Sequence, residues 1–247
     1  MASYSAGMIS SSHASPLLRD TLQDRARVAI GVWGALVALA VAWDLSALDM
    51  PVMLQIGTPS GFPLKDNWWL SVLLHDWLRL FSQLMFGVML LWATRPDRPG
   101  RLPRKERWLL VGLTVASLVV VNLIKINSQT SCPWDLQAFG GDAHYVSHWL
   151  LGVDDGGRGR CFPGGHASSA FAYIGLCLPW LCAPNGTERN PTPGWRLLAL
   201  VLVVGAIAGT AQTLRGAHHP SHTLWTLVIC SGVSLTGWLM GQRWLKP

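Results

Sequence analysis

Lysine, arginine and several histidines between residues 125 and 222 have the chemistry of phosphate binding and phosphoryl transfer. They are Lys125, His166, Arg215, His218, His219 and His222. Cationic side chains bind the oxygens of a phosphate, and a histidine can attack phosphorus or protonate the oxygen that leaves. Ionisable groups at membrane depth are costly, so a cluster of them in a membrane protein indicates a functional site.

A Gly-Gly pair directly before His166 adds a second phosphate-binding feature. In the segment from Cys161 to His166, Gly164 and Gly165 stand where an apolar helix is expected to begin. Glycine lets backbone N–H groups come close to an anion, and a helix N-terminus adds a partial positive charge. A Gly-Gly pair alone is more often a plain turn, but here a histidine and a helix follow it. We therefore expect both glycines to bind phosphate oxygens.

The apolar stretches that must position these residues predict an all-α fold, a polytopic membrane bundle of about six transmembrane helices. Half of the residues are hydrophobic and 13% are charged, a composition too apolar for an ordinary soluble domain. A membrane helix needs ~20 apolar residues because lipid offers backbone groups no partner. The candidate stretches are 27–46, 72–93, 107–126, 166–183, 195–214 and 221–243, and Asp76, Arg79 and Gln83 interrupt the second.

The domain organisation predicted is a polar cytoplasmic tail, residues 1–26, followed by a single membrane domain, residues 27–247. The tail is rich in serine and lacks the short basic start and small-residue cleavage site of a secretory signal. The first apolar stretch is therefore expected to be an uncleaved anchor.

The distribution of charge predicts the orientation in the membrane. Basic residues gather before the first stretch, between the second and third, between the fourth and fifth, and at the chain end, whereas the links 47–71 and 127–165 carry mostly acid. Basic links stay in the cytoplasm, so both termini are expected inside a cytoplasmic membrane and the phosphate-binding residues on its outer, periplasmic or exterior face. The net charge of +6 therefore sets topology or attracts anionic lipid headgroups, and we expect no nucleic-acid partner.

At this point the chain resembles the type 2 phosphatidic acid phosphatases, which share their site with vanadium haloperoxidases. The family pattern is Lys, six residues, Arg-Pro; then Pro-Ser-Gly-His; then Ser-Arg, five residues, His, three residues, Asp. Here six residues separate Lys125 from Cys132-Pro133, Pro163-Gly164-Gly165-His166 matches the second motif, and the segment 216–222 is similar to the third. The resemblance covers roughly residues 108–240 and implies a six-helix membrane phosphatase with its site on the outer face.

Several motif positions depart from that pattern. Cys132 and Gln212 stand where the family has arginines, Gly164 and Ala211 replace serines, and His222 replaces the aspartate. Arg215, three residues after Gln212 and so on nearly the same helical face, is the first candidate to replace a missing arginine. Arg160, just before the second motif, is the second candidate.

The resemblance implies a mechanism that needs neither metal nor cofactor. His218 would attack the terminal phosphorus to form a phosphohistidine, and His166 would protonate the departing lipid oxygen. His222, four residues later, would accept the proton on the far nitrogen of His218. His222 carries no negative charge, which Asp135 or Asp142 would have to supply.

Two cysteines of the outer link, Cys132 and Cys161, are candidates for a disulfide beside the site. An oxidising exterior permits such a bond, although sequence cannot judge its geometry. The other cysteines lie in or near apolar stretches and are expected to pack.

Other functions remain open at this point. They are a lipid phosphotransferase, a non-catalytic lipid-binding relative, and a membrane metalloenzyme in which His144-x3-His148 and the histidines at 218–222 bind metal. The expected partners are the bilayer and a lipid phosphate. Undecaprenyl pyrophosphate is the first candidate substrate on family grounds, followed by phosphatidylglycerol phosphate, phosphatidic acid and lipid A.

Overall fold

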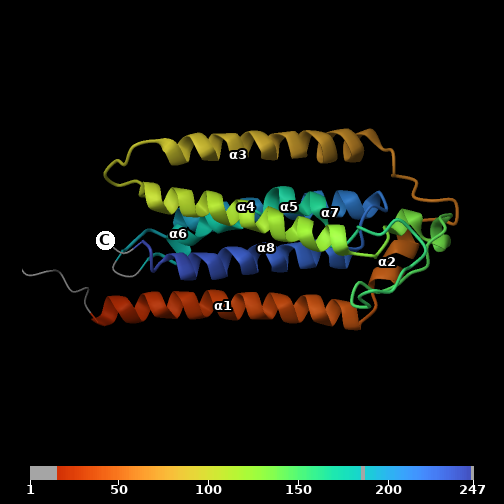
Figure 1. Cartoon of the computed structure of the whole chain (residues 1–247), viewed down its shortest axis with the longest axis horizontal. Helices are drawn as coiled ribbons and strands as arrows, with labels where there is room; N and C mark the ends of the chain where they lie inside the picture. The colour runs from red at the N-terminus through yellow and green to blue at the C-terminus, as the bar shows by residue number, and fades with distance from the viewer. Residues whose placement is uncertain (1–15, 185–186, 246–247) are drawn as a thin grey trace, which may run out of the picture.

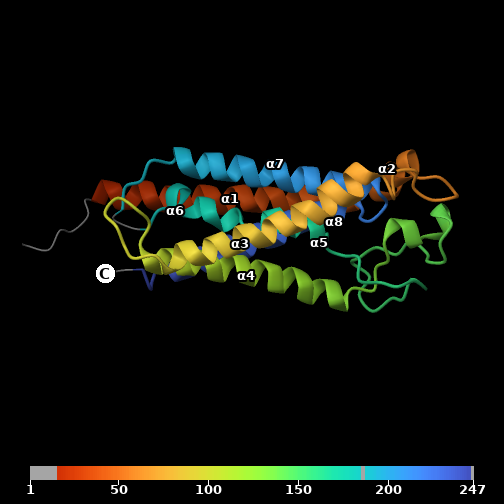
Figure 2. The same ribbon diagram turned by 90° about the horizontal axis from the view of Figure 1, so that it is seen from above.

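The computed structural model describes the backbone of residues 16–184 and 187–245, with side chains from residue 24 onward within those ranges. Long helices run side by side along one axis, and the links 46–68 and 128–164 gather at one end (Figures 1 and 2). The long helices are α1 (Pro16–Leu45), α3 (Leu78–Thr94), α4 (Arg104–Asn127), α7 (Thr192–Leu214) and α8 (Pro220–Gly241). Shorter elements are α2 (Asp49–Ile56), η1 (Trp69–Trp77), η2 (Pro133–Asp135), η3 (Gln137–Phe139), α5 (Gly165–Phe171), η4 (Ile174–Cys177) and α6 (Leu178–Leu181).

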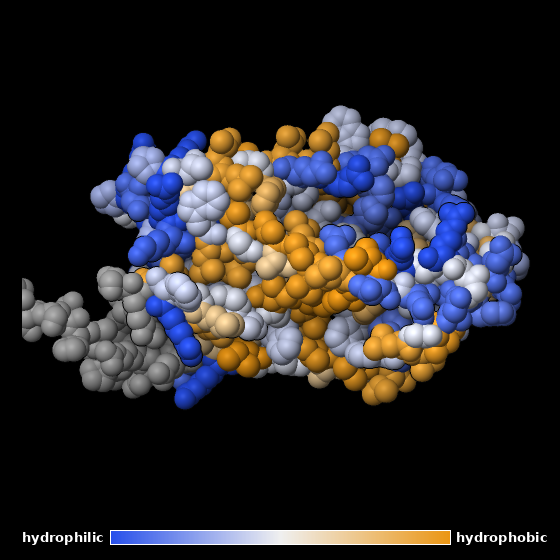
Figure 3. Space-filling model, in the orientation of Figure 1, coloured by the Kyte–Doolittle hydropathy of each residue, from blue (hydrophilic) through white to orange (hydrophobic). Residues whose placement is uncertain are grey.

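The predicted all-α membrane bundle is confirmed, and five helices in the described part of the chain are long and apolar enough to cross a membrane. They are Asp24–Leu45, Trp69–Thr94, Arg104–Asn127, Thr192–Leu214 and Pro220–Gly241. A broad hydrophobic band lies between two hydrophilic ends (Figure 3). The tail predicted for residues 1–26 lies outside the described residues up to Ser15, and its remainder is already part of α1.

The fourth predicted span, 166–183, is a broken helix made of α5, η4 and α6. Pro179 lies at the start of α6, where it has no N–H to continue the preceding helix. Residues 170–175 are all buried by neighbouring helices. Irregular backbone is tolerated at membrane depth only where protein surrounds it, so this break depends on the rest of the bundle.

The core of the bundle forms where α5 and η4 pack between α4, α7 and α8. Trp238 is fully buried there, and its Nε1 donates to the carbonyl of Cys182 at 2.7 Å. Gly205 of α7 lies against the ring of Phe171, and Gly209 lies against Thr223. Small residues of this kind let membrane helices approach closely.

Replacing Gly205 with alanine is expected to lower the free energy of unfolding by ~1–3 kcal/mol, because overpacked cores must shift side chains or backbone. A Cβ at this position would lie 2.0 Å from Phe171 Cε1. Thermal unfolding in detergent measures the effect. Gly87→Ala is the matched control, since a Cβ there meets nothing within 4 Å. Equal melting temperatures for the two variants would contradict the assigned packing.

Two arginine side chains tie the basic end of the bundle together. Arg107 donates to the carbonyls of Trp92 and Arg95 at 2.7 and 2.6 Å, which satisfies acceptors at the end of α3. Arg189 forms two hydrogen bonds, at 2.6 and 2.8 Å, with the buried carboxylate of Glu106. These two arginines of the basic links therefore hold helix ends in addition to carrying charge.

Candidate functional site

His218 lies in the tight turn between α7 and α8, at the end of the bundle that carries the long links. Gly216 makes this turn with φ +76°, and a Cβ there would lie 2.2 Å from the ring of Phe62, so only glycine suits the position. The N–H of Ala217 donates to the carbonyl of Gln212 at 2.9 Å. The turn thus buries His218 to 4% exposure beside α5 and the 128–164 link.

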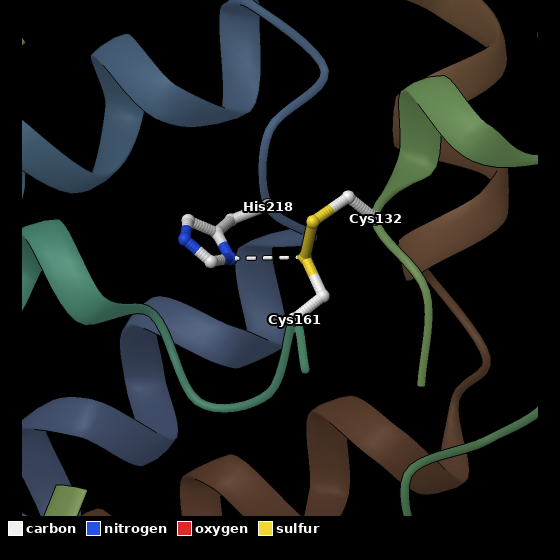
Figure 4. A group of neighbouring side chains, drawn as sticks. All are labelled: Cys132, Cys161 and His218. Carbon is white, nitrogen blue, oxygen red and sulfur yellow. Dashed lines mark hydrogen bonds between the residues drawn. A yellow bond between two sulfur atoms is a disulfide. The ribbon is translucent and has the colours of Figure 1, made fainter. Parts of the chain in front are cut away.

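The hydrogen-bond partners of His218 indicate which ring nitrogen is free to react. Nδ1 lies 3.4 Å from Cys161 Sγ and 3.4 Å from His222 Nδ1. A disulfide sulfur has no hydrogen and can only accept, so a proton on Nδ1 suits both neighbours. Figure 4 shows the other ring nitrogen pointing away from the disulfide. Nε2 therefore keeps a lone pair for attack.

Burial holds the pKa of His218 well below its ordinary 6.5, and the positive charge of Lys125 and proximity to His166 add to this effect. A lowered pKa favours the neutral ring at neutral pH. The neutral form is the one with a nucleophilic lone pair.

His166 begins α5 and faces His218 across the site, with ring centroids 6.4 Å apart. On its other side it contacts the ring of His75 of η1, with centroids 3.9 Å apart and planes tilted by 35°. Arg79, one helical turn after His75, acts electrostatically on His166. Sequence reasoning missed both residues of this second span. The sequence signal that could have found them is the spacing of His75 and Arg79, two ionisable residues one helical turn apart in an otherwise apolar stretch.

Lys125 reaches the start of α5 from the end of α4. A Cβ on Gly165 would lie 3.2 Å from its Nζ, so the ammonium group lies directly over this glycine. The space that Gly165 leaves is therefore next to a cation, as the phosphate-binding prediction requires.

The backbone of Gly164, predicted to bind phosphate, already has hydrogen-bond partners within the protein. Its N–H donates to the carbonyl of His222 at 3.1 Å, and its carbonyl accepts from Thr226 Oγ1 at 3.1 Å. Both backbone groups are thus used to join the start of α5 to the first turn of α8. Gly164 positions His166 and His222 relative to each other, and sequence could not reveal this use of the N–H.

Arg215, the first candidate to replace a missing arginine, lies beside Gln212, the residue at the motif position itself. Its Nη1 donates to Gln212 Oε1 at 3.3 Å, and its Nε donates to the carbonyl of Lys65 at 2.8 Å. Gln212 is 1% exposed, and its Nε2 is buried without a hydrogen-bond partner in the described part of the chain. Arg215 and Gln212 together thus offer donors where the family pattern has one arginine.

Arg160 is not brought into the site. Its backbone has φ +60° and its N–H donates to the carbonyl of Ser128 at 2.7 Å, while the residue is exposed. The carboxylates expected to assist His222 also lie elsewhere, since Asp142 is exposed and Asp135 accepts from the indole of Trp134 at 3.1 Å.

Cys132 and Cys161 form the predicted disulfide, with their Cα atoms 5.2 Å apart and 29 positions apart in sequence. It closes the 128–164 link directly against His218 (Figure 4). Inside that link, the buried carboxylate of Asp155 accepts from Ser131 N–H at 2.6 Å and Ser131 Oγ at 2.8 Å. The disulfide and the hydrogen bonds of Asp155 to Ser131, the residue before Cys132, therefore both restrain the Cys161 sulfur that faces His218.

Removing this disulfide with Cys132→Ser/Cys161→Ser is expected to destabilise the protein by about 3–4 kcal/mol, because a loop of this length gains freedom in the unfolded state. Phosphate release should fall with it, since Cys161 packs against His218. Thermal unfolding with and without reductant measures the effect. Reductant should lower the melting temperature of the wild type alone; an equal response of both proteins would contradict the role of the bond.

The metal-ligand sets that sequence left open do not converge within the described residues. His144 is exposed, whereas His148 lies with His222. The one group with metal-ligand spacing there is Cys132, Cys161 and His218, and its two sulfurs are bonded to each other. A disulfide sulfur is a poor ligand compared with a thiolate.

Comparison with known proteins agrees with this arrangement. The family model described as PAP2 superfamily matches residues 106–246, which is more than half of the chain and includes Lys125, His166 and His218. No curated protein and no solved structure matched the chain. The chain, an all-helical membrane protein with these residues gathered at one end of its bundle, belongs to the PAP2 superfamily of phosphatases.

Proposed function

We propose that this protein is a metal-independent membrane phosphatase that hydrolyses a phosphate monoester or pyrophosphate of a lipid through a phosphohistidine on His218. The observation that carries the proposal is the pairing of His218 Nδ1 with two acceptors, His222 Nδ1 and Cys161 Sγ, both at 3.4 Å. This pairing leaves Nε2 as the nucleophile in a site that also contains Lys125 and Arg215. No cofactor is required for this chemistry.

In the first step, the lone pair of His218 Nε2 forms a bond to the terminal phosphorus as the bond to the lipid oxygen breaks. His166, protonated when the negatively charged phosphate binds beside it, gives that proton to the leaving oxygen as general acid. Lys125, Arg215 and the buried amide of Gln212 stabilise the equatorial oxygens; the free Nε2 of Gln212 supports this role because a buried donor without a partner is costly.

In the second step, water attacks the phosphorus of the phosphohistidine and the phosphorus–nitrogen bond breaks. His166, now neutral, accepts a proton from this water and returns to its starting form. The close contact of His166 with the ring of His75 supports a fixed ring position during both proton transfers. Phosphate leaves, and His218 is regenerated with its Nδ1 proton.

A lipid substrate agrees with the position of the site at the turn between α7 and α8, at the end of the membrane bundle where the long links gather (Figures 1 and 2). The acidic charge of those links supports an outer-face location in the cytoplasmic membrane, with both termini inside. Undecaprenyl pyrophosphate is the first candidate, and phosphatidylglycerol phosphate, phosphatidic acid and lipid A are the others.

The test is phosphate release by detergent-purified protein from a panel of these lipids, with chelator present and no added metal. Release from one lipid would establish the phosphatase and identify its substrate. Release only with added metal would contradict metal independence. Protein-bound phosphate without release would indicate a phosphotransferase that lacks its acceptor, and neither product would indicate a lipid-binding relative.

A further inference from the structure

His222 gives the reacting His218 ring no neighbouring negative charge, so another part of the site must supply one. When His218 forms a bond to phosphorus while keeping its Nδ1 proton, its ring becomes cationic. A carboxylate next to Nδ1 would stabilise that cation, but His222 is neutral and can only share the proton. The structure contains two buried carboxylates on the far side of His222, Asp44 in the last turn of α1 and Asp49 at the start of α2.

Asp44, at the outer end of α1, is the first of these carboxylates. Its Oδ2 accepts from Trp149 Nε1 at 2.9 Å and Trp225 Nε1 at 2.7 Å, and its side chain is 9% exposed. Asp44 therefore places a carboxylate against both the 128–164 link and α8.

His148 connects Asp44 with the catalytic histidines. Its Nε2 lies 3.4 Å from Asp44 Oδ2, an electrostatic contact, since no aligned hydrogen bond is made within the described residues. The ring is stacked on Phe162, with centroids 4.0 Å apart and planes 8° apart. Trp149, Trp225 and His222 also surround the His148 ring, and the His222 ring is nearly perpendicular to it with its centroid 6.0 Å away. His148 is thus held between the carboxylate and His222.

Asp49, the first residue of α2, is the second carboxylate, and its side chain lies against the N-terminus of α8. Its Oδ1 accepts from the N–H of Ser221 at 3.0 Å and from Trp43 Nε1 at 2.8 Å, and its Oδ2 accepts from Ser221 Oγ. Asp49 is 5% exposed. A helix N-terminus carries partial positive charge that would disfavour a cationic ring on the adjacent His222. Asp49 offsets that partial positive charge, because it binds Ser221, the residue before His222.

We propose that Asp44 and Asp49 supply the negative charge that position 222 lacks, and that Asp44 acts on His218 through His148 and His222. Asp44 and His148 are positioning residues, because neither touches the phosphorus. This inference rests on the proposed phosphohistidine reaction. The other titratable groups facing these rings are His219 and Tyr145, packed beside them, and Lys125 and His166, across the site.

Asp44→Asn tests the charge while keeping the shape and an oxygen that can accept from both indoles. We expect the rate constant for phosphohistidine formation in a rapid-quench experiment to fall about tenfold, with KM unchanged. His148→Gln should give the same loss, and the double variant should lose no more than either single variant. Asp142→Asn is the matched control, since it removes an exposed charge from the same end of the protein.

The amplitude of the initial burst of phosphohistidine in the same experiment distinguishes this role from a purely structural one. A variant that only folds poorly lowers the amplitude, which counts active molecules, and leaves the rate constant of the remainder unchanged. Wild-type rate constants in Asp44→Asn, or losses confined to the amplitude, would overturn the charge proposal and leave the phosphatase standing. A wild type without any burst or turnover would instead contradict the proposed function.

A second readout needs no turnover. Burial lowers the pKa of His148, and the nearby carboxylates of Asp44 and Asp49 oppose that shift. In Asp44→Asn the His148 pKa should therefore fall further, whereas in Asp142→Asn it should not change. Nuclear magnetic resonance of protein carrying nitrogen-15 histidine measures both values in detergent. An unchanged His148 pKa in Asp44→Asn would overturn the proposal whether or not a lipid substrate is known.

Discussion

Replacing His218 with glutamine is expected to reduce phosphate release by roughly 10⁴-fold or more, as removal of a covalent nucleophile does in other enzymes. Glutamine occupies a similar volume and keeps a hydrogen-bond donor, but its amide nitrogen has no lone pair available for attack. The loss should lie in kcat, because Lys125 and Arg215 remain to bind the substrate. Initial rates on the best lipid of the panel measure the change.

A second measurement links this loss to the covalent step. Wild-type protein quenched during turnover should carry phosphate on His218 in peptides analysed by mass spectrometry, and His218→Gln should carry none. His144→Gln is the matched control, because His144 is an exposed histidine of the 128–164 link. Full turnover by His218→Gln, with a normal melting temperature, would remove His218 as the nucleophile.

Arg215→Ala is expected to lower kcat by roughly a hundredfold, because preorganised donors to a developing phosphoryl charge act mainly in the transition state. Arg215 is held for this role by the carbonyl of Lys65 and the amide oxygen of Gln212. Arg215→Lys should recover only part of the activity, since an ammonium lacks the planar pair of donors. Steady-state kinetics of the purified variants measures both effects.

Arg160→Ala is the matched control for this prediction and should keep wild-type kinetics. It removes the same charge from the other sequence candidate, which is exposed and whose N–H binds the carbonyl of Ser128. A large loss in Arg160→Ala together with a small one in Arg215→Ala would reverse the assignment. Such a result would mean that the 128–164 link closes over the substrate.

The fold class and the grouping of the candidate site residues could be predicted from sequence because both depend on short-range rules. Long apolar stretches must form helices in lipid, where no water satisfies the backbone, and five of the predicted spans are long helices. Lys125, His166 and His218 could be found because their positions relative to the apolar stretches place them at helix ends that meet at the same end of the bundle. The disulfide could be proposed because two cysteines fell in one outward link.

Only the tertiary structure decided how the remaining groups are used. The N–H of Gly164 donates to the carbonyl of His222, Arg160 is exposed, and His75 of the second predicted span contacts the ring of His166. Asp44 indicated only topology in the sequence, yet it accepts hydrogen bonds from Trp149 and Trp225.

The physical reason for this division is the range of the interactions. Hydropathy and helical periodicity act over a few residues, so they determine which segments form helices and where each helix ends. The partner of a buried polar group depends on which helices meet, and residues 44 and 225 are joined across 181 positions. The sequence by itself therefore determined a membrane bundle with histidine and cationic groups at one end, and the packing of that bundle decided which of them share a site.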